Sequence, residues 1–308
     1  MPVELVKEKY SGPVNTLEIG GGASKPVKIG GETALPFLFD EGDMPNRPQV
    51  ALEILDCEPA EWPDGLLGPY GDSVKDPVKW AVRCVREMGA RVLCVRLQGT
   101  HPDYGSKPAG ETADMLKAIA SQTKVPLVII GSGDDERDND IMPKLSQALK
   151  GENCLLGIAT QNNYKTLAAT CLADGHSVIA ESPIDINIAK QVNILISDMG
   201  FDPTRIVMHP TTTSLGYGME YVYSIMERSR LAAFIGDRML AMPFILFAGQ
   251  EVWKIKEAKD SRVQGINWEI ATAVSLIQAG GDIVVMRHPD AAVSVTKYIN
   301  KLMSGGGK

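Results

Sequence analysis

The sequence lacks the patterns that mark several large classes of protein. No apolar run approaches the roughly 20 residues that a membrane-spanning helix needs, so we expect no membrane partner and a cytoplasmic location. Lys and Arg together number 31 against 38 for Asp and Glu, which gives a formal net charge of -7. Basic residues do not cluster, and nucleic-acid binders usually concentrate them on one face. We therefore expect no nucleic-acid partner.

Cysteine is scarce and widely spaced. The chain has five cysteines and no Cys-x-x-Cys pair; they are Cys57, Cys84, Cys94, Cys154 and Cys171. A cluster held by thiolates needs several cysteines at short spacing. We therefore expect reduced, mostly buried thiols and neither a metal site nor an iron-sulfur cluster on this chain.

From Gln49 onward, apolar runs of strand length alternate with amphipathic stretches of helix length. We predict strands over 49–56, 91–98, 127–130, 155–160, 177–180, 205–208, 244–248 and 282–287. We predict helices over 76–88, 111–122, 141–150, 164–173, 185–199, 217–235, 267–279 and 291–303. Several helices end at a glycine, such as Gly89, Gly175 and Gly200, where a left-handed C-cap costs glycine little.

Eight strand–helix pairs in roughly 250 residues predict a closed (β/α)8 TIM barrel. Apart from Asp282, the strands over 125–130 and 282–286 are continuously apolar, which is typical of parallel strands buried on both faces. A doubly wound open sheet is the alternative. It is disfavoured because no Gly-x-Gly-x-x-Gly follows any predicted strand.

The first 48 residues do not follow the repeat. Residues 3–19 alternate apolar and polar side chains around Ser11-Gly12-Pro13, which predicts a hairpin. The glycines at 20–22 and 30–31 bracket a short segment, and since no helix follows them we interpret them as turns and not as a phosphate loop. We therefore expect a hairpin and connecting loop over 1–48 and the barrel over 49–308.

In a parallel barrel the loops that follow the strands share one end, here called the mouth, where function is usually built. The residues predicted there are Asp56 and Cys57; Gly99, Thr100 and His101; Gly131, Ser132, Gly133 and Asp134; Gln161, Asn162 and Asn163; Glu181 and Ser182; His209 to Ser214; Gly249 and Gln250; His288 and Asp290. Amides, hydroxyls and glycines dominate. Such a rim favours a large polar ligand held by neutral hydrogen bonds.

Four consecutive hydroxyl side chains, Thr211, Thr212, Thr213 and Ser214, follow the strand that ends at Met208. They are candidates for ligand contacts. The alternative is that they cap the long helix expected from Tyr217.

Other chemistries stay open or are disfavoured. His101, His209 and His288, with Asp56 or Glu181, could form a zinc site; the alternative is that these histidines bond locally on the rim. No predicted strand ends in lysine, which disfavours a Schiff-base aldolase. The last two βα loops carry acids where a barrel phosphate site presents backbone amides, so we do not expect a phosphorylated substrate.

A pterin is a second possible ligand. Its ring edge presents hydrogen-bond donors and acceptors that Asn162, Asn163 and Asp134 could match. This would make the chain a pterin-binding barrel methyltransferase acting on methyltetrahydrofolate. The alternative for these residues is that they cap the helices that follow them.

Four segments carry a resemblance to a known family. They are Ile-Ala-Thr-Gln-Asn-Asn-Tyr (158–164), Val-Ile-Ala-Glu-Ser-Pro-Ile-Asp-Ile-Asn (178–187), Met-His-Pro-Thr-Thr-Thr-Ser-Leu-Gly-Tyr-Gly-Met-Glu-Tyr (208–221) and Gly-Gln-Glu-Val-Trp-Lys (249–254). Together they resemble the small subunit of the corrinoid iron-sulfur protein of the acetyl-CoA pathway. That subunit is related to the delta subunit of the archaeal acetyl-CoA decarbonylase/synthase complex.

The resemblance implies a TIM barrel in a heterodimer with a larger corrinoid iron-sulfur subunit. The iron-sulfur cluster would lie on that partner, and the corrinoid (cobamide) would be held between the two chains. A methyltetrahydrofolate:corrinoid methyltransferase would put a methyl group on the cobalt, and acetyl-CoA synthase would take it off, in a route of carbon fixation. The chain would carry no catalytic residue of its own. On their predicted rim positions, Thr211, Thr212, Thr213, Ser214, Gln161 and Asn162 are the residues expected to face the corrinoid.

Overall fold

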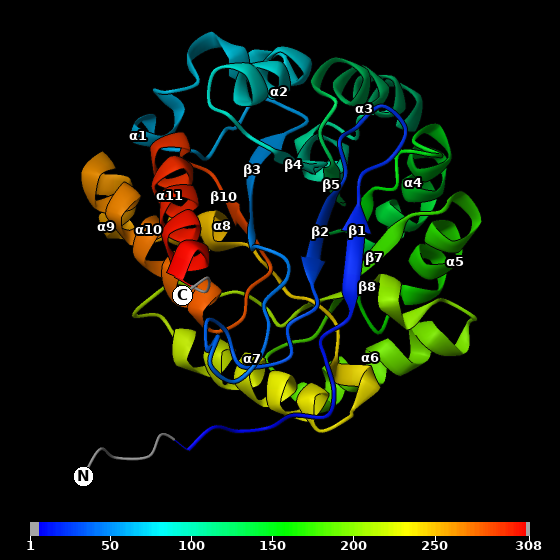
Figure 1. Cartoon of the computed structure of the whole chain (residues 1–308). Coiled ribbons are helices and arrows are strands. Elements are labelled where there is room, and N and C mark those ends of the chain that lie inside the picture. The colour runs from blue at the N-terminus through cyan, green and yellow to red at the C-terminus, as the bar shows by residue number, and fades with distance from the viewer. Residues whose placement is uncertain (1–5, 306–308) are drawn as a thin grey trace.

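The computed structural model describes residues 6–305, and its centre is an eight-stranded parallel barrel surrounded by helices (Figure 1). The barrel strands are β3 (Gln49–Leu55), β4 (Val92–Arg96), β5 (Leu127–Ile130), β6 (Leu155–Ala159), β7 (Ser177–Glu181), β8 (Ile206–His209), β9 (Ile245–Leu246) and β10 (Ile283–Met286). The helices are α1 (Asp64–Leu67), α2 (Pro77–Arg86), α3 (Ala109–Thr123), α4 (Asp135–Ala148), α5 (Tyr164–Asp174), α6 (Ile186–Asp198), α7 (Met219–Phe234), α8 (Ala248–Val252), α9 (Lys256–Asp260), α10 (Arg262–Gln278) and α11 (Pro289–Gly305).

The strand order confirms the TIM barrel predicted from the repeat. Neighbouring strands pair in parallel in the order β8-β7-β6-β5-β4-β3-β10-β9. Between β8 and β9 the ring is closed by a bridge from Met208 to Phe244, and the Met208 N–H donates to the Pro243 carbonyl at 2.8 Å.

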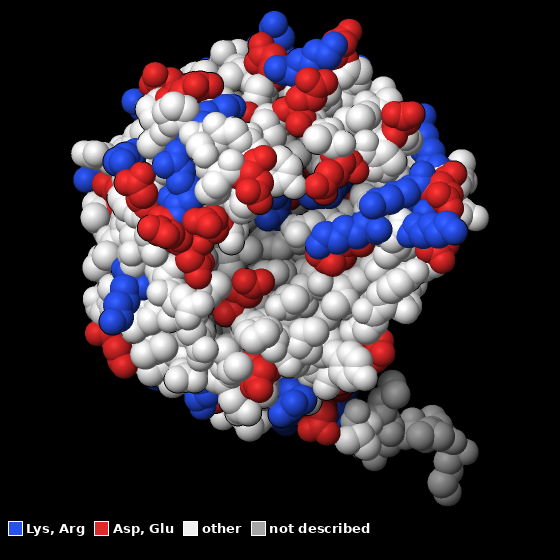
Figure 2. All heavy atoms as spheres, turned by 180° about the vertical axis from the view of Figure 1, so that it is seen from behind, with Lys and Arg blue, Asp and Glu red and all other residues white. Residues whose placement is uncertain are grey.

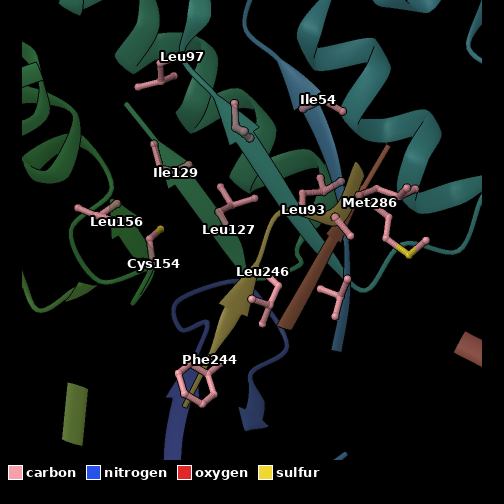
Figure 3. Packing of buried hydrophobic residues seen from close by; sticks show 14 of the residues in the cluster. Ile54, Leu93, Leu97, Leu127, Ile129, Cys154, Leu156, Phe244, Leu246 and Met286 are labelled. Carbon is pink, nitrogen blue, oxygen red and sulfur yellow. The ribbon is translucent and has the colours of Figure 1, made fainter. Parts of the chain in front are cut away.

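The continuously apolar strands divide their side chains between two layers because successive residues point to opposite faces. Outward-facing residues such as Leu93, Leu127 and Leu156 pack between the strands and the helices, as Figure 3 shows. Inward-facing residues such as Val92 and Val128 fill the barrel interior. This double burial is why the strands lack polar alternation.

An antiparallel hairpin, β1 (Thr16–Ile19) with β2 (Val27–Gly30), crosses the end of the barrel opposite the mouth (Figure 1). Its Leu17, Ile19 and Ile29 join the interior cluster, so the hairpin covers the amino ends of the strands. The hairpin prediction is confirmed, but its predicted location around residues 11–13 is wrong. The backbone N–H groups of Ser11 and Gly12 instead donate to the carbonyl of Phe234 at the end of α7. The predicted strand residues 3–5 lie outside the described residues.

Most predicted helices are confirmed, but two begin earlier than predicted. We predicted a helix from residue 267, whereas α10 begins at Arg262. We predicted a helix from residue 141, but α4 begins at Asp135. The first turns of α4 are polar, so they lack the regular spacing of apolar residues from which a helix is predicted. They are stabilised because Asp134 accepts from the Arg137 N–H at 2.7 Å and acidic residues lie near the positive end of the helix dipole. Within residues 6–305 no helix has the length and apolar character needed to cross a bilayer.

Candidate functional site at the barrel mouth

Figure 2 shows the mouth, the face opposite to that in Figure 1. Its charges are unevenly distributed: acidic and basic side chains crowd the upper part of the view, whereas the lower part, over α6 and α7, is largely uncharged. The loop after β8, residues 210–218, contains no charged residue. The mouth therefore has a charged sector and a neutral polar sector.

A buried carboxylate holds two arginines at the centre of the mouth. Glu53, which points inward from β3 and is fully buried, accepts from Nε of Arg96 at 2.6 Å through Oε1 and from Nε of Arg287 through Oε2. Burial alone would raise the pKa of Glu53, but the two guanidinium groups outweigh it and lower that pKa to about 2. The group therefore carries one negative and two positive charges at neutral pH.

A second buried carboxylate fixes the adjoining loop. Asp56 follows β3, and its Oδ1 accepts from the Gly99 N–H at 2.6 Å, while Lys107 donates to the Asp56 carbonyl. A Cβ on Gly99 would lie 3.0 Å from Asp56 Oδ2, so glycine permits this close approach. Asp56 is thus engaged by the Gly99 N–H and by Lys107 of its own chain.

Glu181 and His209 lie side by side at the ends of β7 and β8. Burial lowers the pKa of His209 to about 4, so the imidazole is uncharged at neutral pH. Its Nδ1–H donates to the Ile245 carbonyl at 3.1 Å, which leaves Nε2 as an acceptor 3.5 Å from Oε1 of Glu181. Burial also raises the pKa of Glu181. Because the imidazole is uncharged, this contact is not an ion pair.

The hydroxyl run forms the loop between β8 and α7. Thr211 has a φ of 59° and donates from Oγ1 to the Ser182 carbonyl at 2.8 Å. The Thr212 hydroxyl accepts from the Phe247 N–H at 2.8 Å, and Ser214 is buried. The Thr213 hydroxyl is buried and has no hydrogen-bond partner among the described residues.

The alternative that this run caps the following helix is wrong. The N-cap of α7 is Gly218, which offers no side-chain acceptor. Instead, the first two hydroxyls tie the loop to neighbouring strand ends, while the third keeps unused hydrogen-bonding capacity.

The amides after β6 have different roles. Gln161 and Asn162 are exposed, and Gln161 reaches Gln191 of α6 at 3.3 Å. Asn163 is buried: its Oδ1 accepts from the Thr160 N–H at 2.8 Å and its Nδ2 donates to Asp135 at 2.9 Å.

The capping alternative raised for the pterin residues is therefore partly right. Asp134 is the N-cap of α4, as its bond to the Arg137 N–H shows. Asn163 stands at the N-cap position of α5, but its side chain makes no bond to the helix and closes the preceding turn. Asn162 is the one of the three whose side chain faces solvent.

The three mouth histidines bond locally. His101 Nδ1 accepts from the Asp103 N–H at 3.1 Å, and His288 Nδ1 accepts from the Asp290 N–H at 3.2 Å. Within residues 6–305, no group of three or more His, Cys, Asp or Glu side chains has the geometry to hold a metal ion. The zinc alternative thus gains no support from the structure.

Two cavities open at the mouth on either side of Arg96. One, of about 120 Å³, lies among the ends of β5, β6 and β7 and is lined in part by Asp135, Asn163 and Glu181. The other, of about 300 Å³, is lined by Glu61, Trp62, Arg96, Gln98, His101, Tyr104, Ser132, Gln250, Trp253, Lys254, Lys259 and Arg287.

Sequence reasoning missed the central triad of Glu53, Arg96 and Arg287. One signal was available: Glu53 interrupts the apolar run 50–55 at an inward position of the strand. A lone acid at such a position needs a buried cationic partner. The sequence could not name that partner because Arg287 is 234 residues away.

Comparison with known proteins identifies the family. The family model described as CO dehydrogenase/acetyl-CoA synthase delta subunit matches residues 17–298. Delta 2 of the acetyl-CoA decarbonylase/synthase complex of Methanosarcina acetivorans is 34% identical over 305 residues, covering 94% of this chain and 69% of that protein. The delta subunit of Methanocaldococcus jannaschii is 32% identical over 309 residues, covering 96% and 76%.

Solved structures support the fold at much lower identity. Dihydropteroate synthase from Yersinia pestis, solved with a pterine-sulfa conjugate, superposes with a TM-score of 0.58 and 15% identity, covering 84% of this chain and 94% of that chain. This likeness confirms the barrel architecture alone. The family match, by contrast, confirms the resemblance that the four sequence segments indicated: the chain belongs to the CO dehydrogenase/acetyl-CoA synthase delta subunit family.

Proposed function

We propose that the chain is the small, corrinoid-binding subunit of a methyl-carrier protein within a multi-subunit acetyl-CoA-forming complex. Its partner would be a larger subunit bearing the iron-sulfur cluster. The carrier would receive the methyl group of methyltetrahydrofolate from a methyltransferase and deliver it to acetyl-CoA synthase. Membership of the delta subunit family supports the assignment to such a complex. The neutral polar sector of the mouth supports a corrinoid as the ligand.

The residues of this sector fit a corrinoid chemically. The rim of a corrin ring carries neutral amide side chains, which hydroxyls and amides can match without a charge to desolvate. The observation that carries the proposal is the buried Thr213 hydroxyl, which has no partner among residues 6–305. A buried hydroxyl left unpaired is costly, so a bound ligand that supplies the partner is stabilised.

The other expected residues divide into two kinds. Thr211 and Thr212 use their hydroxyls on the Ser182 carbonyl and the Phe247 N–H, so they shape the loop, and Ser214 is buried beside them. Gln161 and Asn162 are exposed and can turn to a ligand. When bound, the corrinoid supplies the cobalt that carries the methyl group, while the protein's part is to position the macrocycle and exclude water from one side of it.

Exposed apolar side chains border the hydroxyl loop. Leu215, Tyr217 and Tyr221 are exposed by 38%, 52% and 63%, and Ile184 after β7 is exposed by 38%. Tyrosines at such a position are typical of surfaces that pack against another protein or a flat ligand. We assign this border to the contact with the larger subunit.

A reconstitution experiment tests the proposal. The chain, the larger subunit and an equimolar mixture would each be incubated with corrinoid, separated from free ligand, and assayed for cobalt. We expect stoichiometric cobalt in the mixture and much less in this chain alone. Equal cobalt retention by the larger subunit with and without this chain would refute the proposed role.

A variant pair tests the hydroxyl loop within the mixture. Thr213→Val removes the hydroxyl at almost constant volume and should weaken corrinoid retention about tenfold, the loss expected for a good hydrogen bond in a dry site. Thr296→Val is the matched control, because Thr296 lies on α11 and bonds only to the Ala292 carbonyl four residues earlier. Unchanged retention in Thr213→Val would remove Thr213 from the site.

A pterin-binding methyltransferase is a second candidate. The observation that favours it is the 120 Å³ cavity, where Arg96 offers donors and Asp135 and Glu181 offer acceptors for a small heterocycle. Two of the residues first expected to bind a pterin, Asp134 and Asn163, use their side chains on the protein's own backbone. The second candidate would therefore depend on Arg96, Asp135 and Glu181 in this cavity and on Asn162, which is exposed and does not line it.

Turnover by the isolated chain separates the two candidates. A methyltransferase would move the methyl group of methyltetrahydrofolate to added free cobalamin without a partner, whereas a carrier subunit would not. Methyl transfer by this chain alone, abolished by Glu181→Gln, would favour the second candidate.

A further inference from the structure

The larger mouth cavity is cationic, although the chain as a whole is acidic. Of its lining residues, Arg96, Arg287, Lys254 and Lys259 are basic, and Glu61 is the one acidic residue among them. Glu61 is already engaged, because its Oε1 accepts from the Tyr104 hydroxyl at 2.8 Å. The cavity thus concentrates positive charge at one place on a molecule of formal net charge -7.

The two arginines are fixed in place before any ligand binds. Glu53 accepts the Nε–H of both, one on each carboxylate oxygen, so their terminal Nη groups are left for other partners. Nη2 of Arg96 is buried and has no partner among the described residues. One carboxylate cannot neutralise two guanidinium groups, so an unbalanced positive charge remains at the floor of the cavity.

Aromatic side chains limit the movement of both guanidinium groups. Arg287 Cζ lies 4.9 Å from the centre of the Trp62 ring, and Arg96 Cζ lies 5.2 Å from that of Phe247. The backbone of Arg287 is also held, because its N–H donates to Glu269 at 2.6 Å. Restricting a side chain in this way reduces the entropy lost on binding.

From this geometry we propose that the cavity binds an oxyanion, a phosphate or a carboxylate, carried by a small molecule. A planar guanidinium presents parallel N–H groups that match two oxygens of either anion. The volume of about 300 Å³ admits a small organic anion but not a polymer. Lys259, which is exposed and has no acidic partner within 4 Å among the described residues, adds a cation at the entrance.

The acids that argued against a phosphate site in the sequence do not oppose this one. Glu251 pairs with Lys254 at 2.7 Å and Asp290 pairs with Arg262 at 3.2 Å. That argument concerned a site built from backbone amides at a helix start. The proposed site is built from side chains, and it does not depend on the corrinoid proposal.

A fluorescence titration of the full chain without corrinoid tests the inference. Inorganic phosphate and succinate would be added separately at constant ionic strength, with chloride as the balancing anion. Because Trp62 lies against Arg287 and Trp253 lines the same cavity, occupancy should change tryptophan emission in a saturable way, and Trp62→Phe should reduce the change. Saturation by phosphate identifies a phosphate site, and saturation by succinate identifies a carboxylate site. No saturable response to either anion overturns the proposal.

Three variants then place the anion in this cavity. Arg287→Lys keeps the positive charge beside Glu53 but loses the paired N–H donors of the guanidinium group. It should weaken anion binding about tenfold. Lys259→Gln should weaken it about threefold. Lys256→Gln, on the same short helix but outside the cavity lining, should leave binding unchanged.

Circular dichroism and thermal unfolding would establish that each variant is folded. If Arg287→Lys fails to fold, the comparison of Lys259→Gln with Lys256→Gln decides alone. Equal affinity in those two variants would show that the anion binds elsewhere and would overturn the assignment.

Discussion

Replacing Glu53 by glutamine should destabilise the protein strongly, because it leaves two guanidinium groups at the mouth without their shared anion. The pKa of Glu53 falls from 4.5 to about 2 in the folded chain, which corresponds to about 3 kcal/mol of stability at pH 7. Breaking a buried ion pair by removing one partner costs a similar amount, about 3 to 5 kcal/mol. We therefore expect Glu53→Gln to lower the free energy of unfolding by at least about 3 kcal/mol.

The pH dependence has a definite sign. Since folding lowers the pKa of Glu53, its ionisation stabilises the protein fully above pH 4.5 and this contribution is lost as the pH falls toward 2. At pH 3 the contribution is about 1.4 kcal/mol. The gap between wild type and Glu53→Gln should thus narrow in acid.

Urea unfolding followed by circular dichroism at pH 7 and pH 3 measures this gap. Glu87→Gln is the matched control: Glu87 pairs with Arg83 at 2.9 Å, but its side chain is 64% exposed, so its loss should cost at most about 0.5 kcal/mol. A gap below about 1 kcal/mol at pH 7, or one that does not change with pH, would refute the electrostatic account of the triad.

Two further predictions concern packing and thiol chemistry. Gly131→Ala should lower the free energy of unfolding by about 1 to 3 kcal/mol, because the new Cβ would lie 2.3 Å from Oδ2 of Asp138. The control is Gly110→Ala in α3, whose Cβ would meet nothing within 4 Å. In the same urea assay this control should not destabilise the protein. In the native protein at pH 8 a thiol reagent should modify at most Cys57, the one partly exposed cysteine, and slowly, because burial raises its pKa to about 11. Fast modification of several thiols before unfolding would contradict the buried positions.

The barrel could be predicted from the sequence because its strands are buried on both faces and therefore stand out as apolar runs. The run over 127–130 matches β5 at both ends. Glycine also marked helix ends reliably: Gly175 is the C-cap of α5 with a φ of 80°. The spacing of apolar residues was informative about secondary structure wherever a segment packs against the core.

Polar and long-range features were harder to predict. We predicted the hairpin turn at Ser11–Pro13, but alternating apolar and polar residues do not show which turn connects the two strands. The strands that pair are β1 and β2, whose apolar residues enter the barrel. The start of α4 was missed because capping, and not burial, stabilises its first turns.

The position of the polar loops at the mouth could be predicted from the sequence, but the pairing of its charged residues could not. The loop 211–214 lies at the mouth as expected, since its position follows from the strand before it. The partnership of Glu53 with Arg96 and Arg287 depends on contacts between strands far apart in sequence. Such contacts leave no local pattern.

The most direct test of the account is the position of the corrin ring in an experimental structure of this chain assembled with its larger subunit and corrinoid. We predict that the ring lies over the neutral sector of the mouth, with the Thr213 hydroxyl within hydrogen-bonding distance of one of its side chains. A ring bound at the opposite end of the barrel, against the β1–β2 hairpin, or held wholly by the larger subunit, would contradict the proposed function.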